Sequence, residues 1–250
     1  MSNDSLDEFI SRFNAVRELG WVPSHRSNNT GIGKTLEDLM EIEENNSDGP
    51  DLGDVEIKSQ RALSSSKVTL FTKKPSGPDG ANVSLRDNYG IQNPRHPDLM
   101  QMHASMFNYW NKTYDRWAMR LIPDDDEEKI FLQIRDLRTG EMEPFTCWYD
   151  YEVIREVISR KMGILAFVSA DRRVVDGCEH FRYTDCTVFV GGSFENFMKL
   201  LNSGKIQYDI RIGSYKTPGK NYGKVHDHGS GFRIARSNMS ELFLNHKIIS

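Results

Sequence analysis

The sequence has few cysteines and no long apolar run. Its 250 residues include three cysteines, Cys147, Cys178 and Cys186, and no Cys-x-x-Cys pair. This spacing excludes a paired zinc module, leaves Cys178, His180 and Cys186 as a minor metal-site alternative, and predicts a reduced, cytoplasmic environment. A membrane-spanning helix needs about 20 apolar residues in a row. Because no run approaches that length and the acidic N-terminus lacks a signal-peptide pattern, we expect no membrane association.

The chain also lacks an overall positive charge. Its formal net charge is −4, which weighs against a non-specific affinity for nucleic acid. The distribution is uneven, however. Residues 35–58 contain nine acidic residues and one basic residue, whereas residues 201–250 contain eight Lys or Arg and three Asp or Glu. The first segment suits a bound cation and the second suits phosphates, although ordinary solvated surface explains both equally well.

A nucleotide-binding loop is incomplete between Asn28 and Thr35. The pattern Gly-x-x-x-x-Gly-Lys-[Ser/Thr] requires glycine at position 28, and no hydrophobic strand precedes the segment. We therefore predict a glycine-hinged helix start, followed by an apolar stripe from Ile32 to Met40. Glu37 lies beside this stripe, where it either leans over a site at Asp51 or faces solvent.

Residues 50–58 carry the most informative pattern. Two β-branched residues alternate with Glu56 and Lys58, which predicts a strand with this acid and this base on one face. Asp51 lies just before the strand, and Gly53 permits a bend that brings the Asp51 carboxylate to the same sheet edge. Two carboxylates suit Mg²⁺, and a lysine beside them can neutralise charge developing on a phosphate. The spacing alone also fits a solvated strand face.

The remaining segments predict an α/β protein with a mixed sheet. A capping-box signature at Ser5 begins a helix that ends near Gly20, and further helices are expected after Asp150 and Ser193. The strand at 68–73 is predicted to be a hairpin partner of the strand at 55–58. The basic, aromatic-interleaved residues 73–96 either track a nucleic-acid backbone or form a long connection. Further strands are expected at 116–122, 129–135, 142–149, 164–170, 181–190 and 206–212.

The last cluster lies between Asp209 and Arg233. Period two places Asp209 and Arg211 on one strand face, and the loop His226-Asp-His-Gly229 precedes Arg233. Arginine pairs bidentately with guanine and aspartate accepts from cytosine N4, so the cluster fits readout of G·C pairs. A His/Asp metal or catalytic group and a plain polar loop remain open. The lysines on the intervening loop suit phosphate contacts; they are Lys216, Lys220 and Lys224.

Three blocks of the sequence together resemble the MvaI/BcnI family of type II restriction endonucleases, which is related in its catalytic core to the MutH strand-nicking repair enzyme. The His226-Asp-His-Gly229 sequence looks closer to the MvaI side of the family. The segment between residues 90 and 190 matches poorly. The blocks are Thr30-Gly-Ile-Gly-Lys-Thr-Leu-Glu-Asp-Leu-Met40, residues 50–58 with Thr69-Leu-Phe-Thr-Lys73, and Asp209-Ile-Arg-Ile-Gly213 with His226-Asp-His-Gly229 and Phe232-Arg-Ile234.

The resemblance implies a PD-(D/E)XK nuclease core, in which a mixed sheet is flanked by helices and two lobes form a DNA-binding cleft. Residues 1–170 would form the catalytic lobe and residues 171–250 the recognition lobe. It implies a monomer that cuts double-stranded DNA at a CCNGG-type site, with Mg²⁺ as cofactor and a cognate DNA methyltransferase in the same prokaryotic cell. The implied catalytic residues are Glu37, Asp51, Glu56 and Lys58, with Asp51 and Glu56 as metal ligands; the implied DNA-binding residues are Asp209, Arg211, Lys224, His226, Asp227, His228 and Arg233.

Two alternatives remain. A MutH-like repair nuclease would nick one strand and need an activating partner protein, whereas a restriction enzyme would cut both strands alone. A DNA-binding module without activity would retain the fold and not the chemistry. The intact set of Asp51, Glu56 and Lys58 argues against such a module.

Overall fold

The protein is described from a computed structural model that covers residues 4–28, 30–42 and 49–249. Glu43, Glu44 and Asp48, three of the acidic residues of segment 35–58, lie outside the described residues. The chain forms two compact units. Unit 1 comprises Met1–Val68, Val157–Asn196 and Met239–Ser250, and unit 2 comprises Thr69–Glu156 and Phe197–Asn238.

Neither unit is contiguous, whereas the sequence led us to expect two contiguous lobes that meet at residue 170. Strand β10 (Ile164–Val175) forms an antiparallel hairpin with β11 (Cys178–Val190). A boundary at 170 would divide β10 and separate it from its hairpin partner. The backbone hydrogen bonds of this hairpin therefore keep the segments on both sides of residue 170 in the same unit.

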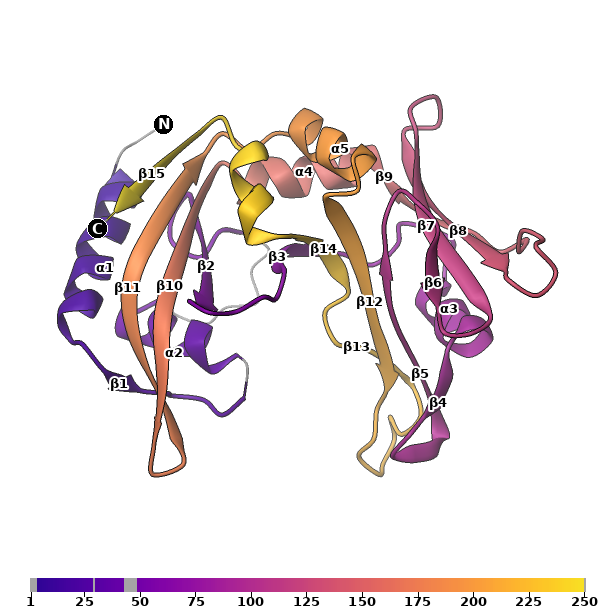
Figure 1. Ribbon diagram of the computed structural model, residues 1–250, viewed down its shortest axis with the longest axis horizontal. Helices are drawn as coiled ribbons and strands as arrows, with labels where there is room; N and C mark the ends of the chain where they lie inside the picture. Colours follow the sequence, from indigo (N-terminus) through magenta and orange to yellow (C-terminus); the bar gives the residue numbers. More distant parts are fainter. Residues whose placement is uncertain (1–3, 29, 43–48, 250) are drawn as a thin grey trace. The chain divides into compact units, whose positions relative to one another are not determined.

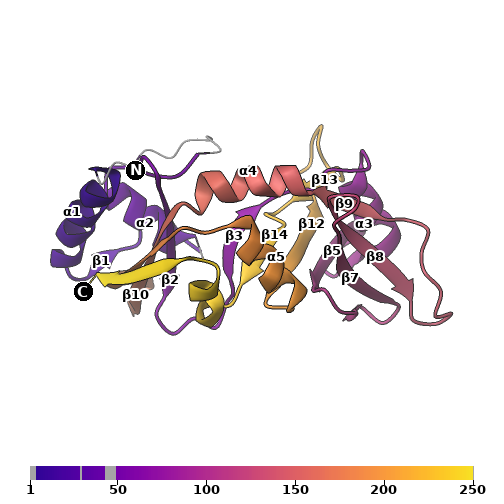
Figure 2. The same ribbon diagram turned by 90° about the horizontal axis from the view of Figure 1, so that it is seen from above.

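Unit 1 is built on a mixed sheet in the order β1-β11-β10-β2. β10 pairs with β11 on one side and, in parallel, with β2 on the other, while β15 adds to β11. Helices α1 and α2 pack on this sheet (Figures 1 and 2). The elements are α1 (Asp4–Glu18), β1 (Val22–Pro23), α2 (Gly31–Leu39), β2 (Val55–Arg61) and β15 (Asn245–Ile249), with β10 and β11 as given above.

The core of unit 1 follows the expected apolar spacing. Phe9 and Phe13 of α1 are fully buried, as is Leu36 on the predicted stripe of α2. They pack in one cluster with Val55 and Ile57 of β2. The predicted first helix, the glycine-led second helix and the strand that carries Glu56 are thus confirmed.

Unit 2 contains two sheets. The first has the order β3-β14-β12-β5-β4, with β13 paired to β12, and the second has the order β6-β7-β8-β9. Helix α3 (Ala81–Tyr89) packs against β5, β12 and β13. The strands of the first sheet are β3 (Val68–Thr72), β4 (Ile91–Asn93), β5 (His96–Met106), β12 (Ile206–Ser214), β13 (Val225–Asp227) and β14 (Gly231–Ile234). The strands of the second are β6 (Asn111–Thr113), β7 (Trp117–Asp124), β8 (Lys129–Asp136) and β9 (Cys147–Asp150).

Three short helices complete the described chain. Helix α4 (Tyr151–Lys161) precedes β10, and α5 (Phe194–Asn202) precedes β12. A 3₁₀ helix covers Arg236–Glu241. None of the helices in the described ranges is long and apolar enough to cross a membrane.

Two expectations about unit 2 were wrong. The strand at 68–73 is β3, which pairs with β14 and not with β2. Residues 73–96 are not one long connection, since they include α3 and β4. Arg86 of this segment does not project toward a partner: it is buried and donates hydrogen bonds to Ser214 Oγ and to the Gly223 carbonyl, each at 3.0 Å.

Candidate functional site

A tight bend places Asp51 beside the first residues of β2. Leu52 and Val55 exchange backbone hydrogen bonds of 3.0 and 2.8 Å, and Gly53 between them has φ +54°. A Cβ at Gly53 would lie 2.3 Å from Ser5 Oγ, so only glycine fits both the conformation and the space. Asp51 Oδ2 accepts a 2.7 Å hydrogen bond from the Ile57 N–H. The bend therefore fixes one carboxylate oxygen against the strand.

Glu56 is buried and paired with two lysines. Its side chain is 1% exposed. Lys58 Nζ donates to Glu56 Oε1, and Lys161 Nζ lies 3.3 Å from Glu56 Oε2. A carboxylate at this depth is stable as an anion only with such partners. The predicted pairing of Glu56 with Lys58 is present, and Lys161 is a residue that sequence reasoning missed.

Glu37 lies on α2, and its carboxylate approaches the helix start and β2. A Cβ built on Gly33 would be 3.7 Å from Glu37 Oε1 and 3.6 Å from Ser59 Oγ. Within the described ranges, no three His, Cys, Asp or Glu side chains are close enough together to hold a metal ion. Glu37 therefore does not form a three-carboxylate cluster with Asp51 and Glu56. This result also gives no support to a metal group at Cys178, His180 and Cys186.

The donors available at the start of β2 fit a hard cation. Asp51 and Glu56 offer carboxylate oxygens, and Lys161 also donates to the Gly49 carbonyl at 3.2 Å, which marks a further oxygen nearby. Mg²⁺ is held in many phosphate-processing sites by one or two carboxylates, with water and phosphate oxygens completing its shell. Two carboxylates are thus sufficient for that ion, whereas a structural zinc site would need four ligands.

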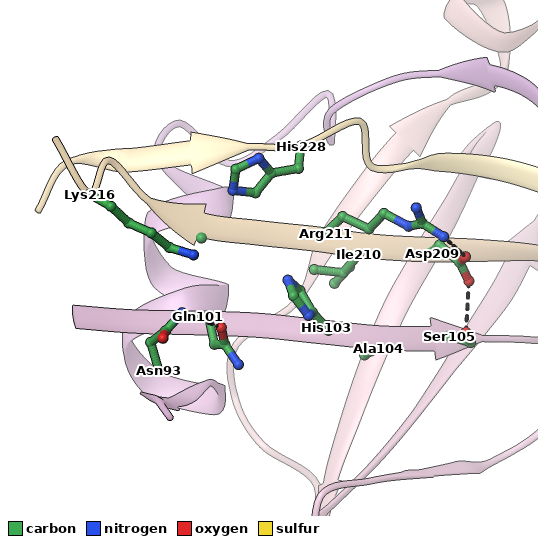
Figure 3. A pocket seen from close by; sticks show the side chains of 11 residues that line it. Asn93, Gln101, His103, Ala104, Ser105, Asp209, Ile210, Arg211, Lys216 and His228 are labelled. Atoms are coloured by element: carbon green, nitrogen blue, oxygen red, sulfur yellow. Dashed lines mark hydrogen bonds and ion pairs between the residues drawn. The ribbon is translucent and has the colours of Figure 1, made fainter. Parts of the chain in front are cut away.

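Unit 2 contains a cavity of about 480 Å³ over one face of the paired strands β5 and β12. Figure 3 shows His103 of β5, Arg211 of β12 and His228, which follows β13, among the side chains that line it. His103 and Arg211 are paired across the two strands, so the strand register itself places them together. The other lining residues are Asn93, Gln101, Ala104, Ser105, Asp209, Ile210, Gly213 and Lys216.

Asp209 lies at one end of this cavity, and both oxygens of its carboxylate have hydrogen-bond or ion-pair partners. It accepts a 2.7 Å hydrogen bond from Ser105 Oγ and another from the Gln207 amide. Its Oδ2 lies 3.1 Å from Arg233 Nε and 3.5 Å from Arg211 Nη2 (Figure 3 shows the Arg211 and Ser105 contacts). The side chains of Asp209 and Arg233 are 12% and 11% exposed, while that of Arg211 is 47% exposed. Arg211 is therefore the member of this group that is most available to a ligand.

Arg233 is largely buried, which does not fit the direct contact with DNA that was expected of it. Arg233 Nη2 donates to the Gly229 carbonyl at 3.2 Å. Burial, and then the charge of Arg211, lower the pKa of the Arg233 guanidinium. These contacts position Asp209 and the loop before β14 more directly than they present a guanidinium to a base.

The histidine loop packs closely on β12. The ring of His226 stacks on Tyr215, with 4.2 Å between centroids, and contacts the His228 ring at the same distance. A Cβ at Gly213 would lie 2.9 Å from His228 Nε2, so glycine lets this ring approach the strand. Burial first, and then nearby cationic groups, lower the pKa of His228; burial and Arg211 likewise lower the pKa of His103. Both shifts favour the neutral form of these rings.

The remaining expected DNA-binding residues have different surroundings. Asp227 Oδ1 accepts hydrogen bonds from the N–H groups of Gly229 and Ser230, at 2.9 and 2.7 Å, and its Oδ2 accepts from Asn82 at 3.1 Å. The carboxylate of Asp227 thus shapes its own loop. Lys224 is exposed, as are the other two lysines of the loop, Lys216 and Lys220.

Strand β5 supplies cavity residues that sequence reasoning did not identify. They are His103, Ser105 and Gln101, which alternate with the buried Met102 and its neighbours. The alternation is visible in the sequence, but its apolar positions are methionines and not the β-branched residues typical of strands. The alternation of polar residues with methionines was the signal that could have predicted this strand and its polar face.

The chain is similar in sequence and in structure to known restriction endonucleases. The model of the MvaI/BcnI restriction endonuclease family matches residues 10–243. A solved structure of the restriction endonuclease MvaI with its cognate DNA substrate is 30% identical, covers 100% of both chains and has a TM-score of 0.90. MvaI in the absence of DNA is likewise 30% identical, with coverage of 100% of this chain and 99% of that chain and a TM-score of 0.64. No curated protein gives a match.

These likenesses confirm the predicted family, its MvaI side and the mixed α/β fold. The family model spans almost the whole sequence, and the structural match has full coverage in both directions. The chain belongs to the MvaI/BcnI restriction endonuclease family and is a type II site-specific endonuclease.

Proposed function

We propose that this enzyme hydrolyses phosphodiester bonds of double-stranded DNA in a Mg²⁺-dependent reaction, at a short site of the CC(A/T)GG or CC(C/G)GG type. The observation that carries the proposal is the buried carboxylate of Glu56 paired with Lys58, while Asp51 is held against the same strand by the Ile57 N–H. This arrangement fits the PD-(D/E)XK pattern implied by the sequence. The class of DNA site rests on the family resemblance.

Asp51 and Glu56 would hold the metal ion, which supplies positive charge at the scissile phosphate and lowers the pKa of an attacking water. Lys58 is exposed to 28% and so is able to reach past Glu56 toward the phosphate. There its ammonium group stabilises charge that develops on the phosphate oxygens. Glu37, on the neighbouring helix, supports the attacking water. The chain thereby provides both the metal ligands and a separate positive charge.

Base readout is assigned to the cavity of unit 2. Arg211 is the guanidinium best exposed for guanine O6 and N7, and Asp209 fixes its direction. His228 lines the same cavity and, as a neutral ring, offers both a donor and an acceptor to a base edge. Arg233 and Asp227 act through Asp209 and the loop, while His226 stacks on Tyr215 and supports His228 by ring contact. Lys224, Lys216 and Lys220 are placed on phosphates.

The cellular setting follows from the chemistry. A site of five base pairs recurs throughout any genome, so an active enzyme would also cut the DNA of its own cell. A cognate DNA methyltransferase that modifies the same site removes this danger. We place the enzyme, acting as a monomer, in the cytoplasm of a prokaryotic cell with such a methyltransferase.

Digestion of a sequenced plasmid tests the proposal. The purified protein in Mg²⁺ should give a discrete set of fragments whose sequenced ends share one CCNGG-type site, and EDTA should abolish cutting. A nicked circle that never becomes linear would support the strand-nicking alternative. The absence of cleavage with Mg²⁺, Mn²⁺ or Co²⁺ would support a DNA-binding module without activity.

A further inference from the structure

Lys161 is a conspicuous residue of unit 1 to which the proposed reaction gives no role. It is the last residue of α4, three residues before β10 begins. Because β10 and β2 are parallel and pair Ile164 with Val55 and Leu165 with Glu56, the end of α4 is placed at the start of β2. From there Lys161 Nζ reaches Glu56 Oε2 at 3.3 Å and the Gly49 carbonyl at 3.2 Å.

Glu56 therefore has two counter-ions, although one would neutralise its charge. Lys58 bonds to Oε1 and Lys161 to Oε2, so each carboxylate oxygen has its own ammonium group. The two lysines differ in what else they touch. Lys161 also binds the backbone carbonyl two residues before Asp51, whereas the side chain of Lys58 has its one hydrogen bond within the described residues to Glu56.

This difference matters for the proposed reaction. If Lys58 leaves Glu56 to stabilise charge on the phosphate, this buried carboxylate would depend on the metal ion alone, and in the metal-free protein it would be an uncompensated buried charge. Lys161 prevents this because it remains on Oε2. Its second bond, to Gly49, also links the segment that leads into Asp51 to the carboxylate of Glu56.

We propose that Lys161 is a positioning residue that acts as the permanent counter-ion of Glu56 and thereby frees Lys58 to act on the phosphate. This inference rests on the proposed function of Asp51, Glu56 and Lys58. It assigns the two lysines different tasks: Lys161 holds the carboxylate and the segment before Asp51 in place, and Lys58 moves to the substrate.

The first test needs neither DNA nor metal. The melting temperature is measured in EDTA for Lys58→Met, for Lys161→Met and for the double variant. Since either lysine alone neutralises Glu56, each single change should lower the melting temperature slightly, and the double change should lower it by more than the sum of the two single shifts. Adding Glu56→Gln to the double variant should restore most of the loss, because no buried charge then remains.

The second test measures single-turnover cleavage of plasmid DNA in Mg²⁺. Lys161→Met should reduce the rate at saturating protein by about 10- to 100-fold, as loss of a residue that orients a metal ligand typically does, without changing the Kd for duplex measured without metal. Lys161→Arg should recover part of the rate because it keeps the charge. Arg160→Met is the matched control, since Arg160 is an exposed cation at the same helix end and should have no effect.

The outcomes separate the two proposals. If Lys58→Met and Glu56→Gln cleave like the parent, the catalytic assignment itself has failed. If those variants are inactive while Lys161→Met behaves like Arg160→Met and the melting shifts are additive, only the role of Lys161 is wrong. A weaker Kd for DNA in Lys161→Met with an unchanged rate would make it a phosphate contact and would also overturn the inference.

Discussion

Each unit of the enzyme places one shielded carboxylate between two cations. In unit 1, Glu56 is held between Lys58 and Lys161; in unit 2, Asp209 is held between Arg211 and a more buried arginine. The flanking cations differ in chemistry. An ammonium group is a compact charge on a flexible stem, whereas a guanidinium is a planar fork that matches the edge of guanine. In the proposed function, similar electrostatics serve charge stabilisation in unit 1 and base readout in unit 2.

The largest expected effect comes from removing a proposed metal ligand of unit 1. Asp51→Ala should abolish cleavage in Mg²⁺, because one of two proposed metal ligands is lost. Binding to cognate duplex, measured by titration without metal, should stay equal or become tighter, since a negative charge near phosphate is removed. Asp54→Ala is the matched control, as Asp54 is an exposed acid in the same bend and should leave cleavage intact. Full activity of Asp51→Ala would contradict the assignment.

The next largest effect comes from removing the exposed arginine of unit 2, and it concerns the preference for the cognate duplex. Arg211→Ala should weaken binding to the cognate duplex by roughly 1–3 kcal/mol, the usual worth of a bidentate base contact, and should change binding to a scrambled duplex little. Arg211→Lys should not restore the difference, because lysine cannot form the two parallel bonds. Titrations on both duplexes in Ca²⁺ at fixed salt measure this. Equal weakening on the two duplexes would place Arg211 among the backbone contacts.

A change at Glu37 tests the catalytic role of unit 1 without removing a proposed metal ligand. Glu37→Gln keeps the shape of the side chain and removes its charge, so the protein should fold with a parent-like melting temperature. If Glu37 supports the attacking water, single-turnover cleavage should slow by about 10-fold. Parent-like turnover would instead identify Glu37 as a solvated helix carboxylate.

The histidines of the cavity in unit 2 predict a pH effect on stability. The pKa values of His103 and His228 are lowered in the folded protein, so near pH 6.5 the unfolded chain binds more protons than the folded one. Stability should therefore fall as the pH is lowered through about 6.5. The double variant His103→Gln/His228→Gln should show a flatter dependence of melting temperature between about pH 7.5 and 5.5. An unchanged slope would contradict the neutral state assigned to these rings.

The smallest effect concerns the loop lysines. Lys220→Ala should weaken binding to cognate and scrambled duplex alike and should reduce the salt slope of log K by about 1. This is what loss of one phosphate contact produces. A change confined to the cognate duplex would move Lys220 from the phosphate contacts to base readout.

Short-range patterns made much of unit 1 predictable. The bend at Gly53, the alternation around Glu56 and the stripe on α2 are all encoded within a few residues. Lys161 was not predictable, because its contact with Glu56 crosses 105 positions and depends on the parallel pairing of β10 with β2. A lysine at the end of a helix carries no local sign of such a partner.

In unit 2, local patterns identified the residue types better than their roles. Asp209 and Arg211 were placed on one strand face by period two, as observed. Arg233 is one residue in a short apolar strand, and nothing nearby in the sequence indicates that Asp209 and Gly229 would enclose it. His103 was missed because β5 is rich in methionine and pairs with β12 across more than 100 residues.

The most direct test removes the more exposed cation of each pair, Lys58 in unit 1 and Arg211 in unit 2, and compares the two variants. Lys58→Ala and Arg211→Ala are compared for single-turnover cleavage of cognate duplex in Mg²⁺ at saturating protein, and for the ratio of cognate to scrambled binding in Ca²⁺. Lys58→Ala should lose about 3 kcal/mol or more of transition-state stabilisation and keep the binding ratio. Arg211→Ala should lose the ratio and cleave bound cognate DNA at close to the parent rate. The account is contradicted if either variant loses both properties or if Lys58→Ala cleaves like the parent.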